Sequence, residues 1–486
     1  MSQTDYLAIL PLLILGGTAI IALIASTFSK RPVAAFIIAL LGTIASMVAV
    51  GYSWQLAPRK IAGFLSVDGF TLFAFALILA ATLVTAIAGL GSLSGRKKEG
   101  GEFFFLLLAS SVGACVLSAA SSFAAFFLGL ELLSVTLFAL IAYKRGHLPA
   151  TEAGITYLIL AGVSSGFLLF GMALVYAALG SMDIARVVQA AAAHEGGFLV
   201  AVGLSLIAVA VGFKLAVVPF HFWTPEIYDA APAPVAGFIA TASKGAMAVL
   251  LIRFFAPSGI SALGVFPWIF AVISGVTMFV GNLLALREAN VKRILAYSSI
   301  AHLGYLLIAF VASGTQAAQA TAFFLAAYFA STLGAFLCVG AASGQERESD
   351  RIDDYRGLAA KRPWLAGSFT ASLLSLAGLP LTAGFMGKFV IFSAGIGSFL
   401  WVLAVLLAVN STISLFYYLR IVSAMYRAEE TAEPVGAAGA ALAPAAPAPA
   451  VPLLTGLAVA IVTLGIVVLG VYPTPLLDLI RAFTNG

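Results

Sequence analysis

Apolar stretches of about 20 residues recur along almost the whole chain, each bounded by charged residues, glycine, proline or asparagine. An α-helix rises ~1.5 Å per residue, so a stretch of this length can cross the ~30 Å hydrocarbon core of a bilayer. The sequence therefore predicts an all-α polytopic membrane protein with about 14 transmembrane helices. These spans, numbered in chain order, are 6–28, 33–53, 66–91, 102–120, 122–143, 153–180, 197–220, 233–253, 262–286, 292–313, 316–341, 366–391, 397–426 and 453–472.

The charge content excludes several classes of protein. Charged residues make up 9% of the chain, against roughly 25% in a typical soluble protein. Disorder, a disulfide scaffold and a nucleic-acid-binding domain are excluded as descriptions of the whole chain, and the bilayer is the expected surrounding. Cys115 and Cys338 each lie in an apolar run without a CxxC motif, so neither an iron–sulfur nor a zinc site can be built. We expect no metal and no cofactor on this chain.

Basic residues predict the orientation of the spans. Loops after odd-numbered spans hold seventeen of the 25 Lys and Arg residues, whereas the opposite loops hold five. Basic loops stay in the cytoplasm, so both termini are predicted on the periplasmic side. The seventeen are Lys30, Arg31, Arg96, Lys97, Lys98, Lys144, Arg145, Arg287, Lys292, Arg293, Arg347, Arg351, Arg356, Lys361, Arg362, Arg420 and Arg427, and the five are Arg59, Lys60, Arg186, Arg253 and Arg481.

Composition also divides the chain into segments. Residues 427–452 are rich in Ala and Pro and are expected to form a semi-rigid linker. Residues 345–362 alternate acids and bases, which is typical of a solvated loop or of a surface helix that contacts a partner. The other expected segments are an N-terminal three-helix segment (1–91), a first repeat (102–253), a second repeat (262–426) and a C-terminal helix and tail (453–486).

Four charged residues lie inside spans, namely Glu131, Lys214, Lys244 and Lys388. Lys244 would lie ~14 Å along its helix from the nearer membrane surface, too far for its side chain to reach the headgroups. Each such charge costs roughly 2.5–3.5 kcal/mol at a helix centre. Static buried ion pairs are the alternative explanation, but three bases cannot all pair with one acid. The pattern favours a polar pathway through the bilayer.

Two predicted helix breaks adjoin these charges. Pro219 and Pro225 follow Lys214, and Pro380 precedes Lys388. Broken helices at membrane depth are tolerated where they are buried in protein or line a watery cavity, and their free carbonyls help to bind ions. The pattern L-A-x-x-P occurs at both breaks with an offset of 161 residues, and residues 138–143 and 305–310 echo each other at 167. We expect two inverted five-helix repeats, spans 4–8 and 9–13, in which Ser298 aligns with Glu131.

His302 lies inside span 10 with Ser298 and Tyr305 close by, and these three residues are candidates for a proton relay. A buried histidine that only packs against its neighbours is the alternative. The sequence has no phosphate-binding loop, nucleophile elbow or soluble catalytic module. Energy for transport must therefore come from elsewhere.

Three motifs resemble a known family. They are KLAVVPFHFWTPEIYDAAPAPVAGFIATASKGA, NVKRILAYSSIAHLGY and GLPLTAGFMGKF. They are similar to the antiporter-like membrane subunits of respiratory complex I, whose core Mrp-type cation/proton antiporters share. The resemblance covers roughly residues 66–426. Glu131 in the stretch GLELLS (129–134) and a lysine, rather than a glutamate, at position 388 resemble one branch of these subunits.

The resemblance implies a role for each buried charge. Glu131 and Lys214 would form the charge pair of a first half-channel, Lys244 would lie on the central axis, and Lys388 would handle protons in the second half. It also implies a bacterial inner-membrane complex that carries FMN, iron–sulfur clusters and quinone, although this chain offers ligands for none of them. The expected partners are neighbouring antiporter-like subunits and small membrane subunits.

Three functions remain open at this point. The leading hypothesis is a proton-translocating subunit of an NADH:quinone oxidoreductase, driven by electron transfer in other subunits. The second is a cation/proton antiporter subunit of the Mrp class, and the third is a membrane scaffold that does not conduct. The chains that accompany this one would discriminate the first two.

Overall fold

A computed structural model describes residues 2–28, 32–93, 100–144, 146–255, 266–312, 314–344, 348–428 and 451–484. Most of the Ala/Pro-rich linker (429–450) lies outside these residues, as do Lys30, Arg31, Arg96, Lys97, Lys98, Arg145 and Arg347 of the orientation argument.

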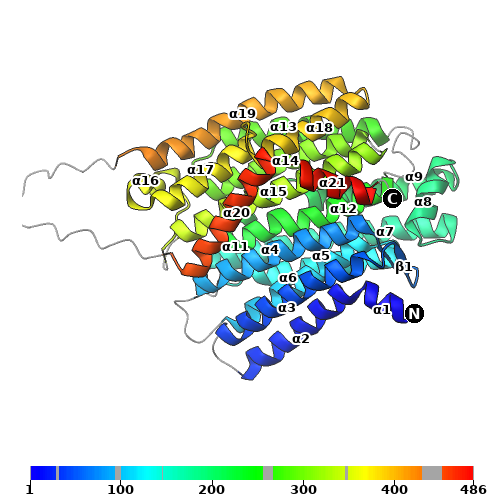
Figure 1. The fold of residues 1–486 in the computed structure, drawn as a ribbon. Helices are drawn as coiled ribbons and strands as arrows, with labels where there is room; N and C mark the ends of the chain where they lie inside the picture. The colour runs from blue at the N-terminus through cyan, green and yellow to red at the C-terminus, as the bar shows by residue number, and fades with distance from the viewer. Residues whose placement is uncertain are drawn as a thin grey trace, which may run out of the picture.

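The described chain is almost entirely helical (Figure 1). The N-terminal segment holds α1 (Gln3–Ala8), α2 (Leu10–Phe28), α3 (Pro32–Trp54), β1 (Arg59–Ile61), β2 (Leu65–Val67) and α4 (Gly69–Leu93). Next come α5 (Gly101–Ala119), α6 (Phe123–Ile141), α7 (Leu148–Leu179), α8 (Ile184–Ala192), α9 (Gly197–Leu215), α10 (Trp223–Ala230), α11 (Ala233–Phe238), the π-helix η1 (Ile239–Ser243) and α12 (Lys244–Phe255). The remainder is α13 (Phe266–Arg287), α14 (Val291–Ala312), α15 (Gly314–Ala342), the 3₁₀ helix η3 (Ile352–Tyr355), α16 (Leu358–Lys361), α17 (Pro363–Ala377), α18 (Ala383–Gly397), α19 (Trp401–Tyr426), α20 (Leu453–Val471) and α21 (Thr474–Thr484).

Thirteen spans among the described residues are long and apolar enough to cross a membrane. The remaining predicted span, 366–391, is split between α17 and the shorter apolar helix α18. The prediction of an all-α polytopic membrane protein with broken helices is confirmed. A short antiparallel hairpin pairs β1 with β2, with Arg59 opposite Val67, and the sequence argument did not predict it.

Burial differs sharply between the spans. The window across α11, η1 and α12 is fully buried, and those of α14 and α15 are 94% buried, whereas that of α20 is 22% buried. These central spans carry Lys244, His302 and the hydroxyl side chains around them. In Figure 1, α2 and α3 lie at one edge of the bundle and α13 and α19 at the other, and both termini lie at the same end of it. Polar side chains are thus concentrated in the spans that lipid cannot reach.

Helix crossings relate the two predicted repeats by a constant offset. At the α5–α6 crossing, a Cβ on Gly113 would lie 2.5 Å from the nitrogen of Leu133. At the α13–α14 crossing, a Cβ on Gly281 would lie 2.7 Å from the nitrogen of Ala301. Both residues of the second crossing lie 168 positions after those of the first. This register aligns Glu131 with Ser299, one residue beyond the Ser298 predicted from the weak sequence echo.

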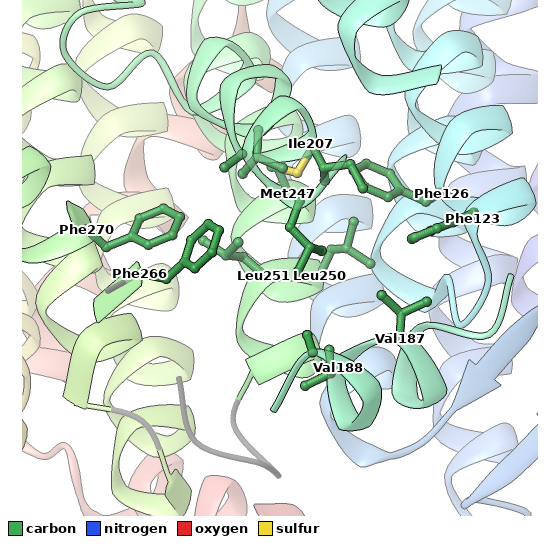
Figure 2. A pocket seen from close by; sticks show the side chains of 14 residues that line it. Phe123, Phe126, Val187, Val188, Ile207, Met247, Leu250, Leu251, Phe266 and Phe270 are labelled. Atoms are coloured by element: carbon green, nitrogen blue, oxygen red, sulfur yellow. The ribbon is translucent and has the colours of Figure 1, made fainter. Parts of the chain in front are cut away.

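A small apolar cavity of about 50 Å³ has α8 in its wall (Figure 2). Its walls come from α6, α8, α9, α12 and α13, with Phe123 and Phe126 on one side and Phe266 and Phe270 on the other. All of its lining side chains are apolar. Ions and proton-carrying water need polar partners, so this cavity offers no route for them.

Gly113 provides a test of the crossing. Gly113→Ala places a methyl group against the backbone of α6 and should destabilise the protein by about 1–3 kcal/mol, as overpacking does. The matched control is Gly162→Ala, because a Cβ there would meet nothing within 4 Å. Thermal unfolding of the detergent-solubilised chain measures both. Equal midpoints for the two variants would refute the close approach of α5 and α6.

Candidate functional site

Lys214 lies buried in the last turn of α9. Its Nζ donates hydrogen bonds to the Ser134 Oγ of α6, 3.1 Å away, and to the Tyr157 hydroxyl of α7, 2.9 Å away. The same ammonium lies 5.6 Å from the centre of the Tyr157 ring. Two hydroxyl oxygens and an aromatic ring thus replace water around this charge.

Glu131 lies three residues before Ser134, on the same face of α6. It is partly buried and accepts a hydrogen bond from the Ser165 hydroxyl of α7. Within the described chain, Glu131 and Lys214 do not form an ion pair. Both side chains contact α7, but at different residues, so the two members of the implied charge pair are separately hydrogen-bonded.

The first predicted break separates α9 from α10. The helix ends at Leu215, and Ala216 adopts the left-handed conformation with φ of 59°. In the break, the Val218 N–H donates to the Thr277 hydroxyl of α13, 3.1 Å away. Pro219 lies within the break. Pro225, which was also predicted to break the helix, instead occupies the first turn of α10, where a proline costs no intrahelical hydrogen bond.

Lys244 follows the π-helix η1 directly and is 1% exposed. Its Nζ donates a hydrogen bond of 2.8 Å to the Ser299 Oγ of α14, and Ser299 is joined to the Tyr328 hydroxyl of α15 by a bond of 2.7 Å. The ammonium lies 5.3 Å from the Tyr228 ring centre and 6.0 Å from that of Trp223. π-Helical turns are frequent at functional sites. Here one lies immediately before the central charge.

Lys388 is held by the second broken helix. It lies in α18, and its Nζ donates to the carbonyls of Leu376 at 2.9 Å and Ala377 at 2.8 Å, in the last turn of α17. A third hydrogen bond of 3.0 Å reaches the Ser411 Oγ of α19. Gly378 ends α17 with φ of 85°, which frees these carbonyls. The negative end of one half-helix therefore binds the cation of the next.

His302 lies between the central and second lysines. Its ring centre is 5.3 Å from that of Tyr328 and 5.4 Å from that of Tyr305. The Lys388 ammonium lies 5.2 Å from the Tyr305 ring, and His302 also faces the Leu376 carbonyl that Lys388 binds. Its buried Nδ1 has no hydrogen-bond partner among the described residues. Two of the candidate relay residues, His302 and Tyr305, thus lie where a relay between Lys244 and Lys388 would require them.

Ser298, the third candidate relay residue, is hydrogen-bonded to the Tyr418 hydroxyl rather than to a lysine or to His302 among the described residues. Near it, buried Asn282 donates to the Tyr305 hydroxyl at 3.0 Å and to the Asn410 Oδ1 at 3.1 Å. Neither asparagine was predicted from the sequence as a site residue. Each lies in an apolar run, and screening spans for amides as well as charges would have found them.

Together these contacts form one polar axis through the bundle. Its first part runs from Lys214 through Tyr157 and Trp223 to Lys244, with 5.4 Å between the two ring centres. Its second part runs from Lys244 through the following residues to Lys388: Ser299, Tyr328, His302 and Tyr305. Over the described residues, no carboxylate lies within 4 Å of these three lysines. Hydroxyls, backbone carbonyls and ring faces solvate them instead.

Comparisons with known proteins identify relatives of the whole chain. Residues 120–414 match the family described as "NADH:quinone oxidoreductase/Mrp antiporter, TM". The chain is 45% identical to NADH-quinone oxidoreductase subunit N of Nitrosospira multiformis over 87% of both chains. It is 41% identical to subunit N of Methylococcus capsulatus over 98% of this chain and 94% of the relative.

Two solved structures share the fold. Respiratory complex I from Thermus thermophilus contains a chain with a TM-score of 0.80 and 32% identity, covering 96% of this chain and 98% of that one. The Mrp complex from Dietzia sp. DQ12-45-1b contains one with a TM-score of 0.86 and 20% identity, covering 100% of this chain and 97% of that one. The second likeness shows the fold alone.

Gly378 provides a test of the Lys388 site. Gly378→Ala should cost about 1–2 kcal/mol, because the left-handed conformation disfavours a side chain. The new Cβ would also lie 2.9 Å from the Lys388 Cδ and push the ammonium off its carbonyls. We expect Lys388 to react faster with acetic anhydride, as measured by mass spectrometry. Gly367→Ala, in the same half-helix with open space around it, is the control. Unchanged reactivity in Gly378→Ala would contradict the binding of the Lys388 ammonium by the Leu376 and Ala377 carbonyls.

Proposed function

The chain belongs to the NADH:quinone oxidoreductase/Mrp antiporter membrane family, and on that basis we propose that it is the proton-translocating subunit N of a bacterial complex I. The single observation that carries this proposal is the row of three buried lysines, Lys214, Lys244 and Lys388, with hydroxyl groups and aromatic rings between them. The chain itself performs no redox chemistry in this proposal. Electron transfer through FMN, iron–sulfur clusters and quinone of the parent complex supplies the energy.

Each lysine on the axis can hold or release one proton. Tyr157 and Ser299 hydroxyls contact Lys214 and Lys244 directly, and a hydroxyl can accept and donate at once, as a proton relay requires. Positive charges on neighbouring lysines repel each other, and they do so more strongly in the protein interior than in water. A proton arriving on one lysine therefore favours release from the next. Neighbouring lysines would be charged in alternation.

We assign the roles in chain order. Glu131 and Lys214 take up the proton in the first half, Lys244 links the two halves, and Lys388 releases it from the second half-helix. Ser165 of α7 donates a hydrogen bond to Glu131, and Ser134 of α6 accepts one from Lys214. The two serines thus lie on the two neighbouring helices α6 and α7. A small movement of α7 against α6 would change the distance between Glu131 and Lys214, and with it the electrostatic attraction between the two side chains.

The setting follows from the relatives and the basic loops. The complex lies in the bacterial inner membrane, and neighbouring antiporter-like and small membrane subunits are its partners. We propose that both termini are periplasmic, since basic residues concentrate in the opposite loops.

An Mrp-type antiporter subunit is the second candidate. The Dietzia Mrp chain favours it by fold, but its identity of 20% is below the 38–45% identity with proteins named subunit N. Sodium-gradient-driven proton movement without NADH oxidation would support the antiporter. A scaffold that does not conduct is the third candidate, and the next two experiments test it.

Ser299 tests the central link. Ser299→Ala removes a hydrogen bond to the Lys244 ammonium, and such bonds contribute about 1.5–3 kcal/mol, so proton translocation should fall about tenfold or more. NADH-driven acidification of inverted membrane vesicles, followed with a pH-sensitive dye at equal complex content, measures it. The matched control is Ser46→Ala, which loses a buried hydrogen bond to Pro11 in the N-terminal segment. Normal pumping by assembled Ser299→Ala complex would contradict the proposed route.

Lys388 tests the sign of the charge. Lys388→Glu places a carboxylate against the Leu376 and Ala377 carbonyls and reverses the coupling to the rest of the axis, so pumping should be lost. Lys388→Arg retains the positive charge and should keep part of the activity. The same vesicle assay compares the two variants. Equal activity at equal assembly would show that the charge at 388 plays no part in translocation.

A further inference from the structure

A groove of about 420 Å³ lies at the opposite end of the bundle from the two termini, between the C-terminal part of α19 and the loop around η3. Three arginines line it, namely Arg356, Arg420 and Arg427. The only acidic side chain in its lining, Asp353, is already paired with Arg356 at 2.9 Å. The groove therefore carries a net positive charge, and none of the contacts described above uses it.

Two of these arginines have no acidic partner in the part of the chain that the structure describes. Arg420 donates a hydrogen bond of 2.7 Å to the Leu286 carbonyl, and no carboxylate of the described chain lies within 4 Å of Arg420 or Arg427. Two other basic residues at this end, Lys292 and Arg293, differ. Lys292 is paired with Glu348 at 2.6 Å, and Arg293 with Glu288 at 3.1 Å. The groove thus retains donors for an external anion.

The backbone fixes the groove in shape. The Gly357 N–H donates to the Arg427 carbonyl at 3.0 Å, which ties the η3 loop to the end of α19. The Ile352 N–H donates to the Ala289 carbonyl at 3.0 Å, and Ala289 lies in the turn between α13 and α14. Arg356 comes from the η3 loop and Arg420 from α19, so both segments that these bonds hold together contribute an arginine to the lining.

An apolar stripe leads from the groove along α19 toward the membrane centre. Val405, Val409, Phe416 and Leu419 recur every three to seven residues on one helix face and are all exposed. From Val405 to Leu419 the helix rises ~21 Å, more than the ~15 Å of one leaflet's hydrocarbon. Basic side chains at the surface and an exposed apolar stripe below them match the two parts of a phospholipid.

We propose that this groove binds an anionic phospholipid, with its phosphodiester between Arg356, Arg420 and Arg427 and its acyl chains along the α19 stripe. Basic pockets at the membrane surface are the usual site for such headgroups. Guanidinium groups match phosphate oxygens with paired hydrogen bonds. The proposal goes beyond proton translocation and does not depend on it, because it assigns a lipid ligand to a surface away from the lysine axis.

The purified complex tests the proposal by native mass spectrometry with added phosphatidylglycerol or phosphatidylcholine. We expect phosphatidylglycerol to be retained preferentially, and each arginine removed to weaken its binding about fivefold. Arg420→Gln and Arg427→Gln are the test variants, and Arg420→Lys should bind more tightly than Arg420→Gln because it keeps the charge, but more weakly than the unchanged protein because it loses the paired hydrogen bonds. Arg186→Gln is the matched control, since Arg186 is an exposed arginine on the other end of the molecule, paired with Glu195.

Three outcomes would overturn it. Equal retention of both lipids would remove the role of the headgroup charge, and unchanged binding in Arg420→Gln/Arg427→Gln would place the lipid elsewhere. Displacement of phosphatidylglycerol by equimolar inorganic phosphate would indicate an anion site without acyl-chain contacts. A photoreactive side chain at position 416 shows whether the groove is occupied by a lipid or by a segment of a neighbouring subunit. Cross-linking to lipid supports the proposal, whereas cross-linking to an acidic segment of a neighbouring subunit refutes it.

Discussion

The arrangement of this protein depends on how neutral protein groups stabilise three buried lysine ammonium groups that have no carboxylate within 4 Å among the described residues. A charge at a helix centre costs several kcal/mol, and an ion pair would remove much of that cost. None of the three lysines uses one within the described chain. Lys214 is bound by two hydroxyls, Lys244 by one hydroxyl and two ring faces, and Lys388 by two backbone carbonyls and a hydroxyl. Such neutral ligands stabilise a proton without fixing it as strongly as a carboxylate would. The central helices are buried because these groups must surround the lysines.

The two halves of the chain stabilise their buried lysines in different ways. Lys214 precedes its break and is held by side chains of neighbouring helices, whereas Lys388 follows its break and is held by the backbone of the preceding half-helix. Moving a neighbouring helix can loosen the first arrangement. Loosening the second requires the two halves of one broken helix to separate. The first half is thus suited to respond to movements at its periphery, and the second to a change within its own backbone.

Much of the fold could be predicted from the sequence, since apolar length and proline position are local properties. The spans, the buried lysines and the breaks at Pro219 and Pro380 all followed from them. Contacts between helices were less accessible. Tyr157 and Tyr328 read as ordinary aromatic residues, because only the packing of α7 and α15 brings their hydroxyls to Lys214 and Ser299. The separation of Glu131 from Lys214 depends on Ser165, whose position no motif indicates. The predicted alignment of the two repeats was wrong by one residue. It rested on a weak sequence similarity, whereas the contacts at the two helix crossings give the offset between the repeats.

The π-helix before Lys244 has a consequence for the rotational phase of α12. A π-helical turn bonds residues five apart instead of four, so η1 accommodates one residue more than an α-helix of the same path. One residue corresponds to ~100° of rotation about the helix axis. Every side chain of α12 is therefore turned by that angle relative to an uninterrupted α-helix. Lys244 at its start reaches Ser299, and Arg253 near its other end reaches Asp68 beside α4. The inserted residue thus sets the rotation at which α12 contacts both the bundle centre and the N-terminal segment. Removing one residue from η1 would turn Lys244 and Arg253 away from their partners together.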